Sequence, residues 1–301
     1  MNYPPHVTII EVGPRDGLQN EPSYVATPTK VDLINLLSQS GLQHIEATSF
    51  VSAKAIPQLA DNEDVFRAIN KPANVHFSAL VPNERGMQTA LAVGVKNIAI
   101  FTAASELFNQ HNINCSIADS IARFKPVIAL ARDKRIHVRA YISCALGCPY
   151  EGAISPKKVL NVAELLIELG VDEISLGDTI GVGTPQQTKE LIATISKCLP
   201  LSQVAMHFHD TYGQAVANTY AALECGINRF DSSVAGLGGC PYARGASGNV
   251  ATEDILYLLH GLGLETGIDI YQIVAAGDMI CKALGRKNQS KVANALLANL
   301  G

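Results

Sequence analysis

Residues 204–210 read Val-Ala-Met-His-Phe-His-Asp, and this stretch decides the fold that we expect. Apolar residues lead into two histidines spaced two positions apart, which predicts a β-strand that ends in polar residues. Side chains alternate between the two faces of a strand, so His207 and His209 are expected on the same face. Two imidazoles on one face at the end of a strand can hold a divalent metal. Two structural histidines bonded to backbone groups are the alternative.

Similar short β-rich runs recur along the chain and alternate with longer helical patterns. The expected strands are residues 7–12, 43–48, 75–81, 97–101, 137–143, 173–176, 204–209 and 229–234. The expected helices between them are residues 29–40, 63–70, 84–93, 117–133, 156–169, 185–197 and 214–224. Eight strand–helix alternations predict a (β/α)8 TIM barrel, with an open doubly wound sheet as the alternative.

The position of the polar residues favours the barrel. They follow the expected strands, at Arg15-Asp16, 46–49, Asp178, 207–210 and 236–249. A barrel gathers the carboxyl ends of all its strands at one mouth, which explains every cluster at once. Two more helices are expected at about 253–262 and 271–284. We therefore expect a single catalytic domain of residues 1–301, with a barrel at about 5–250 and a C-terminal helical extension at about 251–301.

The composition limits the classes of partner. The chain has 301 residues, of which 48% are hydrophobic and 17% charged, as in a globular enzyme. A net charge of −4 without a basic block argues against nucleic acid. Seven scattered cysteines favour a reducing, cytoplasmic compartment. No apolar run approaches the roughly 20 residues of a membrane span, so no membrane partner is expected.

The segment Gly-Pro-Arg-Asp-Gly at 13–17 follows an apolar strand. Asp16 is well placed as a hard oxygen ligand for a metal. Arg15 can hold a carbonyl or enolate oxygen with its planar fork of donors. An ordinary turn with a surface ion pair is the alternative. Glu46 lies within an apolar strand and needs a partner, since an unpaired buried charge is expensive. We expect Glu46 to pair with Arg15 and orient it.

Two glycine-rich segments remain. Residues 175–185 look like a phosphate-binding loop but lack the G-K-[ST] ending and the dinucleotide spacing, so Asp178 at the strand end is the residue of interest. Residues 233–249 contain Cys240 and end in Asn249. So many glycines are typical of a loop that lets backbone approach a ligand, although an uneventful long loop is the alternative. The spacing of Cys144 and Cys148 is not C-x-x-C, so a zinc or disulfide role is not favoured.

Taken together, these stretches resemble the 3-hydroxy-3-methylglutaryl-CoA (HMG-CoA) lyase family. The resemblance is carried by residues 11–21, 46–52, 103–108, 112–116, 143–152, 175–185 and 209–215 and by the loop around Cys240, nearly end to end. Isopropylmalate and homocitrate synthases and 4-hydroxy-2-oxovalerate aldolases share the Arg-Asp-Gly and His-x-His patterns. They lack the cysteine loop.

The resemblance implies a metal-dependent lyase that converts HMG-CoA to acetyl-CoA and acetoacetate. It implies a Mg²⁺ or Mn²⁺ ion held by Asp16, His207, His209 and Asn249. It also places Arg15 at the thioester oxygen, Glu46 behind Arg15, and Asp178 near the substrate. His207 is a further candidate for catalysis. The implied partner is an acyl-CoA substrate, and a homo-oligomer such as a dimer is compatible with it.

One departure concerns the CoA nucleotide. Gly285 precedes Arg286 and Lys287 where relatives have a polar asparagine, so the residues that bind the nucleotide are not identified.

The reaction leaves an enolate carbon that must receive a proton. Cys240 is the candidate acid, because a thiol with a reference pKa near 8.5 is protonated at pH 7. A packing cysteine is the alternative, which would leave His207 or a metal-bound water as the donor. Three other functions stay open: a related aldolase or Claisen-type enzyme acting on another 3-hydroxyacyl-CoA, a metal hydrolase, and a catalytically inactive binding protein.

Overall fold

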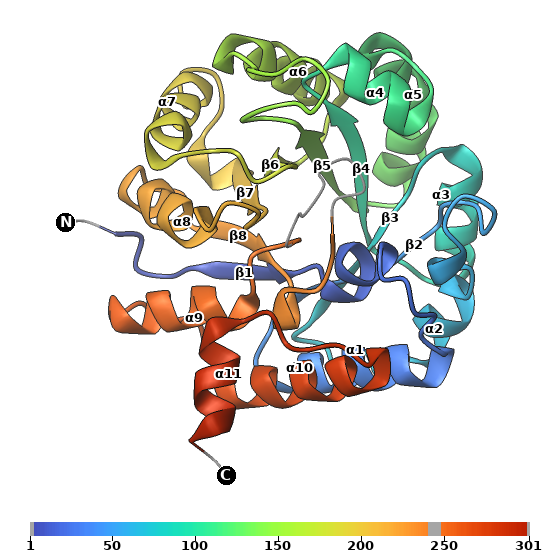
Figure 1. The fold of residues 1–301 in the computed structure, drawn as a ribbon. Helices are drawn as coiled ribbons and strands as arrows, with labels where there is room; N and C mark the ends of the chain where they lie inside the picture. The colour runs from blue at the N-terminus through green and yellow to red at the C-terminus, as the bar shows by residue number, and fades with distance from the viewer. Residues whose placement is uncertain (1–2, 240–247, 300–301) are drawn as a thin grey trace.

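A computed structural model describes residues 3–239 and 248–299, and within them the chain forms a closed barrel of parallel strands (Figure 1). The strands are β1 (Thr8–Glu11), β2 (His44–Ser49), β3 (His76–Leu80), β4 (Asn97–Ala103), β5 (His137–Ser143), β6 (Glu173–Asp178), β7 (Val204–Phe208) and β8 (Arg229–Ser232). Each strand pairs with its neighbour in sequence, and β1 pairs with β8 with Thr8 opposite Arg229. This closure confirms the predicted TIM barrel and excludes the open sheet.

Helices surround the barrel (Figure 1). They are α1 (Thr27–Gln39), α2 (Asn62–Ala68), α3 (Glu84–Ala92), α4 (Glu106–Ile113), α5 (Ile117–Asp133), α6 (Pro156–Leu169), α7 (Pro185–Ile195) and α8 (Ala215–Glu224). The α7 helix shows why these segments fold as they do, since Thr184 and Gln187 form a capping box and Pro185 occupies the first turn. The sequence did not predict α4, a short helix whose main signal is the Ser105 cap.

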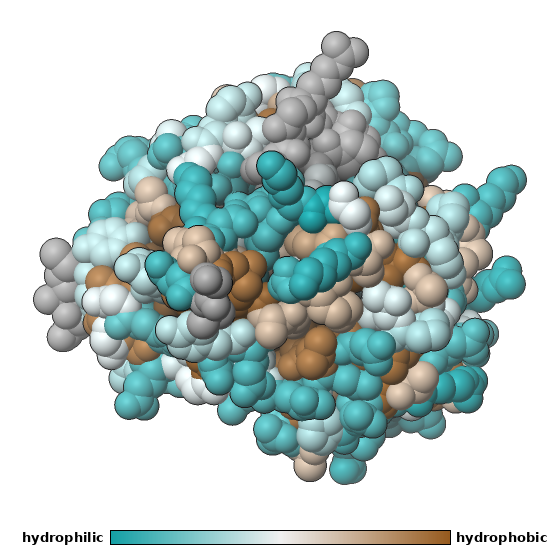
Figure 2. Space-filling view, turned by 60° about the horizontal axis from the view of Figure 1, so that its bottom comes forward, coloured by the Kyte–Doolittle hydropathy of each residue, from teal (hydrophilic) through white to brown (hydrophobic). Residues whose placement is uncertain are grey.

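The C-terminal extension consists of α9 (Thr252–Gly261), α10 (Ile270–Leu284) and α11 (Lys291–Ala298). The first two helices were predicted and the third was not. The Asp254 carboxylate ties α11 to α9, because it accepts hydrogen bonds from the Ser290 hydroxyl (2.7 Å) and the Val292 N–H (3.0 Å). Figure 2 shows that hydrophilic side chains dominate the face viewed there, with apolar side chains in separate patches. None of the helices in the described ranges is long and apolar enough to cross a membrane.

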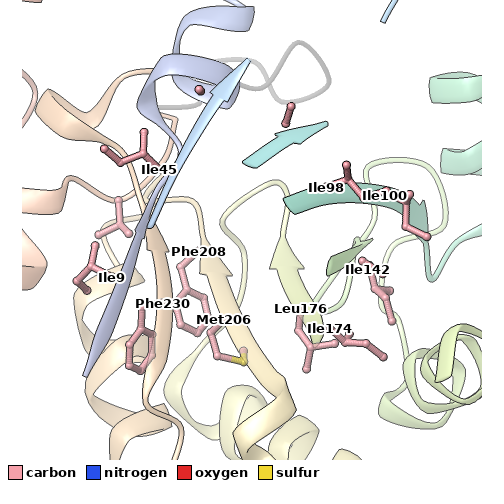
Figure 3. Close-up of a cluster of buried hydrophobic side chains, with 14 of the residues drawn as sticks. Ile9, Ile45, Ile98, Ile100, Ile142, Ile174, Leu176, Met206, Phe208 and Phe230 are labelled. Atoms are coloured by element: carbon pink, nitrogen blue, oxygen red, sulfur yellow. The ribbon is translucent and has the colours of Figure 1, made fainter. Parts of the chain in front are cut away.

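The hydrophobic core lies between the strands and the helices. Alternate strand residues such as Ile9, Ile45, Ile98 and Phe230 point away from the barrel axis and are buried (Figure 3). Burying a side chain of this size stabilises the fold by roughly 1.5–3 kcal/mol. The main core therefore uses the outer face of the strands, and a second, small apolar cluster of Leu80, Ala99 and Tyr141 lies on the inner face.

The barrel interior is unusually polar. Arg139 on β5 forms ion pairs with Glu173 and Asp231, both at 2.6 Å. At the amino ends of the strands, the rings of His44 and His76 stack with their centroids 5.0 Å apart. Burial and the nearby Arg229 guanidinium lower the pKa of His44 to about 3, with smaller contributions from the other basic side chains around it. Branched apolar residues normally fill the interior of a TIM barrel. The charged and polar side chains here therefore indicate a functional role for this interior.

Candidate metal centre and active site

Asp16, His207 and His209 meet at the carboxyl mouth of the barrel. His207 lies on β7, His209 follows that strand, and Asp16 lies on a π-helical turn, η1 (Gly13–Gly17), after β1. One ligand atom from each residue lies within 4.8 Å of those from the other two. The predicted convergence of these three side chains is confirmed.

Glycines allow η1 to place Asp16 there. A Cβ atom on Gly13 would lie 2.5 Å from Glu11 Oε1, and one on Gly17 would lie 2.6 Å from Ser233 Oγ. Both contacts are far shorter than van der Waals separation. The turn therefore packs tightly against the last residue of β1 and the segment that follows β8, and its position is fixed by that contact.

An aspartate behind His207 sets the orientation of the imidazole. His207 Nδ1 lies 3.1 Å from Asp231 Oδ2, and Asp231 also accepts hydrogen bonds from Arg139 (2.6 Å) and from the Ser175 hydroxyl (2.8 Å). Burial opposes ionisation, but Arg139 and His207 hold the pKa of Asp231 below its usual value. A charged aspartate requires the proton on Nδ1, which leaves the Nε2 lone pair, 4.0 Å from Asp16 Oδ2, for a metal.

The other two side chains also have the protonation state of metal ligands. Burial, followed by the proximity of His207, lowers the pKa of His209 to about 4. Its Nδ1 atom is buried and has no hydrogen-bond partner among the described residues. Burial opposes ionisation of Asp16, but Arg15 and the two histidines hold its pKa well below the usual range. A neutral His209 imidazole beside an ionised carboxylate fits a divalent cation.

Asn249 completes the group expected from the sequence. Residues 209 and 249 are paired by an antiparallel bridge, and the Asn249 amide donates hydrogen bonds to Asp16 Oδ2 (2.8 Å) and to the Leu237 carbonyl (3.2 Å). The structure thus brings all four expected ligands together. Cys240, the expected acid, lies outside the described residues.

Arg15 is held as the sequence predicted. Its Nε atom donates to Glu46 Oε1, and one terminal nitrogen donates to Asp16 Oδ1 at 2.5 Å. Glu46 is buried, and its second oxygen accepts a hydrogen bond from the Tyr141 hydroxyl at 2.9 Å. The Arg15 guanidinium lies over the Tyr141 ring, 5.3 Å from its centroid. Glu46 therefore orients Arg15, as expected.

Sequence reasoning missed three residues that join these parts, Arg139, Tyr141 and Asp231. Arg139 donates to the Tyr141 hydroxyl at 3.2 Å and to Asp231. The contacts therefore close a ring, whose members are Arg15, Glu46, Tyr141, Arg139, Asp231, His207 and Asp16. Arg139 and Tyr141 are two positions apart in the expected strand and therefore share one face of β5, and this spacing is the sequence signal that could have identified them.

A cavity of about 520 Å³ opens beside this ring. Arg15, Asp16, His207 and His209 form one part of its wall, and apolar side chains such as Leu80 form another. Such a cavity suits a small molecule with a polar group at one end and an apolar stretch beyond it.

Asp178, which the family resemblance places near the substrate, does not itself line the cavity. It points away from the barrel axis, its side chain is buried, and Thr179 rather than Asp178 lines the cavity. Its carboxylate accepts hydrogen bonds from the backbone N–H groups of Val182 (3.1 Å) and Gly183 (2.8 Å). Burial raises the pKa of Asp178 to about 6 despite these bonds. The carboxylate shapes the loop that follows β6.

Two other sequence features are resolved. Cys144 and Cys148 are not joined by a disulfide. Gly285 ends α10 in the left-handed conformation with φ of 67°, which favours glycine at this position. The following Arg286 forms an ion pair with Glu21.

Comparison with known proteins agrees with this geometry. The HMGL-like family model matches residues 6–280. The mitochondrial hydroxymethylglutaryl-CoA lyase of Rattus norvegicus is 56% identical over 292 residues, which cover 97% of this chain and 90% of that protein. The cytoplasmic 3-hydroxy-3-methylglutaryl-CoA lyase of Mus musculus is also 56% identical, with 97% and 85% covered.

Solved structures give the same result. Hydroxymethylglutaryl-CoA lyase from Pseudomonas aeruginosa is 54% identical with a TM-score of 0.98, covering 99% of this chain and 100% of that one. An HMG-CoA lyase from Acinetobacter baumannii, solved with coenzyme A and 3-methylmalate, is 37% identical with a TM-score of 0.93, covering 98% and 96%. The chain therefore belongs to the HMGL-like family, and within it to the hydroxymethylglutaryl-CoA lyases.

Proposed function

We propose that this protein is a carbon–carbon lyase that cleaves HMG-CoA to acetyl-CoA and acetoacetate. The observation that carries the proposal is the meeting of Asp16, His207 and His209 with Arg15 in the wall of one cavity, in a chain of this family. An acyl-CoA substrate is supported by the relative solved with coenzyme A.

The reaction has four changes to accomplish. The tertiary hydroxyl loses its proton, the bond between the hydroxyl-bearing carbon and the thioester α-carbon breaks, and the electron pair passes to the thioester as an enolate. The enolate carbon then takes up a proton to give acetyl-CoA. A bound Mg²⁺ or Mn²⁺ supplies Lewis acidity that makes the hydroxyl easier to deprotonate. We assign Asp16, His207, His209 and Asn249 as the residues that hold it.

We assign Arg15 to the thioester oxygen, where negative charge develops. The ion pairs with Glu46 and Asp16 use two of its nitrogens and hold the guanidinium rigid, and the residue lines the cavity. Burial opposes its charge, but the two carboxylates raise the pKa of Arg15 further above its usual value, so it remains a cation. A donor that is already in place costs no reorganisation during the reaction.

We propose Cys240 as the acid that protonates the enolate carbon. The support is that Gly239, the residue before it, lines the cavity. Cys240→Ser should bind substrate and metal almost normally but turn over far more slowly, because a hydroxyl is a much weaker acid. Thiol alkylation should inactivate the enzyme, with protection by substrate. Unchanged turnover in the serine variant would move the role to His207 or a metal-bound water.

The test of the overall function is a coupled assay of acetoacetate release from HMG-CoA, with chelator and with added Mg²⁺ or Mn²⁺. Metal-dependent release is expected. Turnover of another 3-hydroxyacyl-CoA but not of HMG-CoA would favour the alternative of a related Claisen-type enzyme.

We further propose one catalytic domain of residues 1–301, a cytoplasmic location and a homodimer. Cell fractionation tests the location, since the relatives include both a mitochondrial and a cytoplasmic lyase. Light scattering tests the homodimer.

A further inference from the structure

Two buried carboxylates near the mouth of the barrel play no part in the chemistry above. Glu11 points outward from the end of β1 and is fully buried. Its Oε1 atom accepts hydrogen bonds from the Gly13 N–H (2.8 Å) and the Val234 N–H (2.9 Å). Its Oε2 atom accepts one from the Thr252 hydroxyl (2.6 Å). One side chain thus connects β1, the turn η1, the segment after β8 and the start of α9.

The second carboxylate holds the same segment from the other side. Both oxygens of Glu253, on α9, accept the Ala235 N–H at 3.0 Å. Ala235 belongs to the turn η4 (Val234–Gly236) and has a φ of 57°, a left-handed conformation that is costly for a residue with a side chain. A Cβ atom on Gly277 of α10 would lie 2.9 Å from Glu253 Oε1, so the carboxylate is packed closely in place.

The segment held by this pair leads directly to the metal centre. The turn η4 continues into Leu237, whose carbonyl accepts the Asn249 amide at 3.2 Å. The same amide donates to Asp16 Oδ2 at 2.8 Å. Leu237 also contacts the end of η1, because a Cβ atom on Gly17 would lie 2.8 Å from Leu237 Cβ. A shift of η4 would therefore move both the partner of Asp16 and the turn that carries Asp16.

We propose that Glu11 and Glu253 are positioning residues that hold η4 so that Asn249 and Asp16 meet in the geometry needed for metal binding. The proposal rests on the metal site proposed above and assigns these two residues no contact with substrate or metal. Their role is that of hydrogen-bond acceptors and does not require a negative charge. Burial raises the pKa of Glu11 to about 7 and that of Glu253 to about 8, which agrees with a role that survives protonation.

The test is a titration of the purified apoprotein with Mn²⁺, followed by electron paramagnetic resonance of the free ion. Glutamine keeps one acceptor oxygen, so Glu11→Gln and Glu253→Gln should bind Mn²⁺ nearly as the unmodified chain does. Glu11→Ala and Glu253→Ala should raise the dissociation constant roughly tenfold or more, the range seen when groups behind metal ligands are removed. Rescue by glutamine is the readout that a loss of stability alone would not produce.

Leu256→Ala is the matched control. Leu256 is fully buried on the same helix as Glu253 and makes no polar contact, so its truncation should lower the melting temperature without changing Mn²⁺ affinity. Should the alanine variants not fold, Thr252→Val removes the hydrogen bond to Glu11 Oε2 and should raise the dissociation constant by a smaller factor.

Three outcomes would contradict the proposal. Alanine variants that keep normal Mn²⁺ affinity and lose stability as Leu256→Ala does would make the pair purely structural. Glutamine variants as weak as the alanine variants would show that charge matters. An unmodified chain that binds no Mn²⁺ would overturn the metal site and this role with it, whereas Mn²⁺ binding without lyase turnover would overturn only the proposed reaction.

Discussion

Replacing Asp231 by asparagine should weaken metal binding while leaving the barrel folded. Asparagine has the same shape as aspartate but lacks its charge and carries donors on one side. If the side-chain NH2 of the asparagine faces His207 Nδ1, the imidazole must carry its proton on Nε2, the atom that faces Asp16. If the NH2 faces Arg139 instead, two hydrogen-bond donors meet across the 2.6 Å contact between residue 231 and Arg139. Neither arrangement reproduces the native one.

The size of the effect follows from these contacts. Removing the carboxylate behind a metal-binding histidine typically costs 10–100-fold in metal affinity. That range corresponds to about 1.4–2.7 kcal/mol of binding free energy. The loss of folding stability should stay below the roughly 3–5 kcal/mol of a fully broken buried pair, because Arg139 keeps Glu173 at 2.6 Å and Tyr141 at 3.2 Å.

The assay is Mn²⁺ titration of the apoprotein together with turnover at saturating Mn²⁺. Asp172→Asn is the control, since the Asp172 carboxylate accepts the Val138 N–H at 2.8 Å at the opposite end of the barrel. We expect weaker binding only in Asp231→Asn, with turnover partly restored by excess metal. A dissociation constant within twofold of the unmodified chain would refute the reasoning that Asp231 sets the state of His207.

Three further predictions concern the ends of the barrel. His207→Ala and His209→Ala should each lose most metal affinity and turnover while keeping the circular dichroism spectrum; full activity of both variants in chelator would contradict the ligand assignment. Arg15→Lys should be nearly as damaging as Arg15→Gln, roughly 10²–10³ in kcat, because one ammonium group cannot replace a fork that contacts both Glu46 and Asp16; near-normal turnover of the lysine variant would show that a point charge suffices. His44→Val should flatten the acid dependence of stability. The pKa of His44 is about 3 in the folded state against about 6.5 unfolded, so its contribution is complete above about pH 6.5 and is lost as the pH falls towards 3. Urea unfolding at pH 7 and pH 5 measures this, and an unchanged difference between the two would contradict it.

The sequence predicted the barrel because polar residues follow strands along the whole chain, and the mouth of a barrel brings all of those strand ends together. It predicted the pairing of Arg15 with Glu46 because an isolated charge in an apolar strand needs a partner. The orientation of Asp178 was harder to predict. Strand alternation places Ser175 and Gly177 on the inner face of β6 and Asp178 on the outer face, and assigning the faces requires the register of β6 in the barrel.

Arg139 and Tyr141 were missed for a related reason. Both faces of a strand in a parallel barrel are buried, so alternation does not separate an inner polar face from solvent. The helices α4 and α11 have only eight residues each, which is too short a stretch for apolar periodicity to identify a helix.

The apolar outer face of most strands and the polar inner face around Arg139 have a consequence for how the protein can change. Outer residues such as Ile98 and Phe230 contact helices and none of the reacting groups, so exchanges of similar volume there should alter heat resistance and leave turnover alone. Inner residues such as Arg139 and Tyr141 share partners, so a second substitution among them should cost less than the first. Directed evolution should therefore accumulate stabilising exchanges on the outer face one at a time, whereas a new substrate preference would require several inner positions to change together.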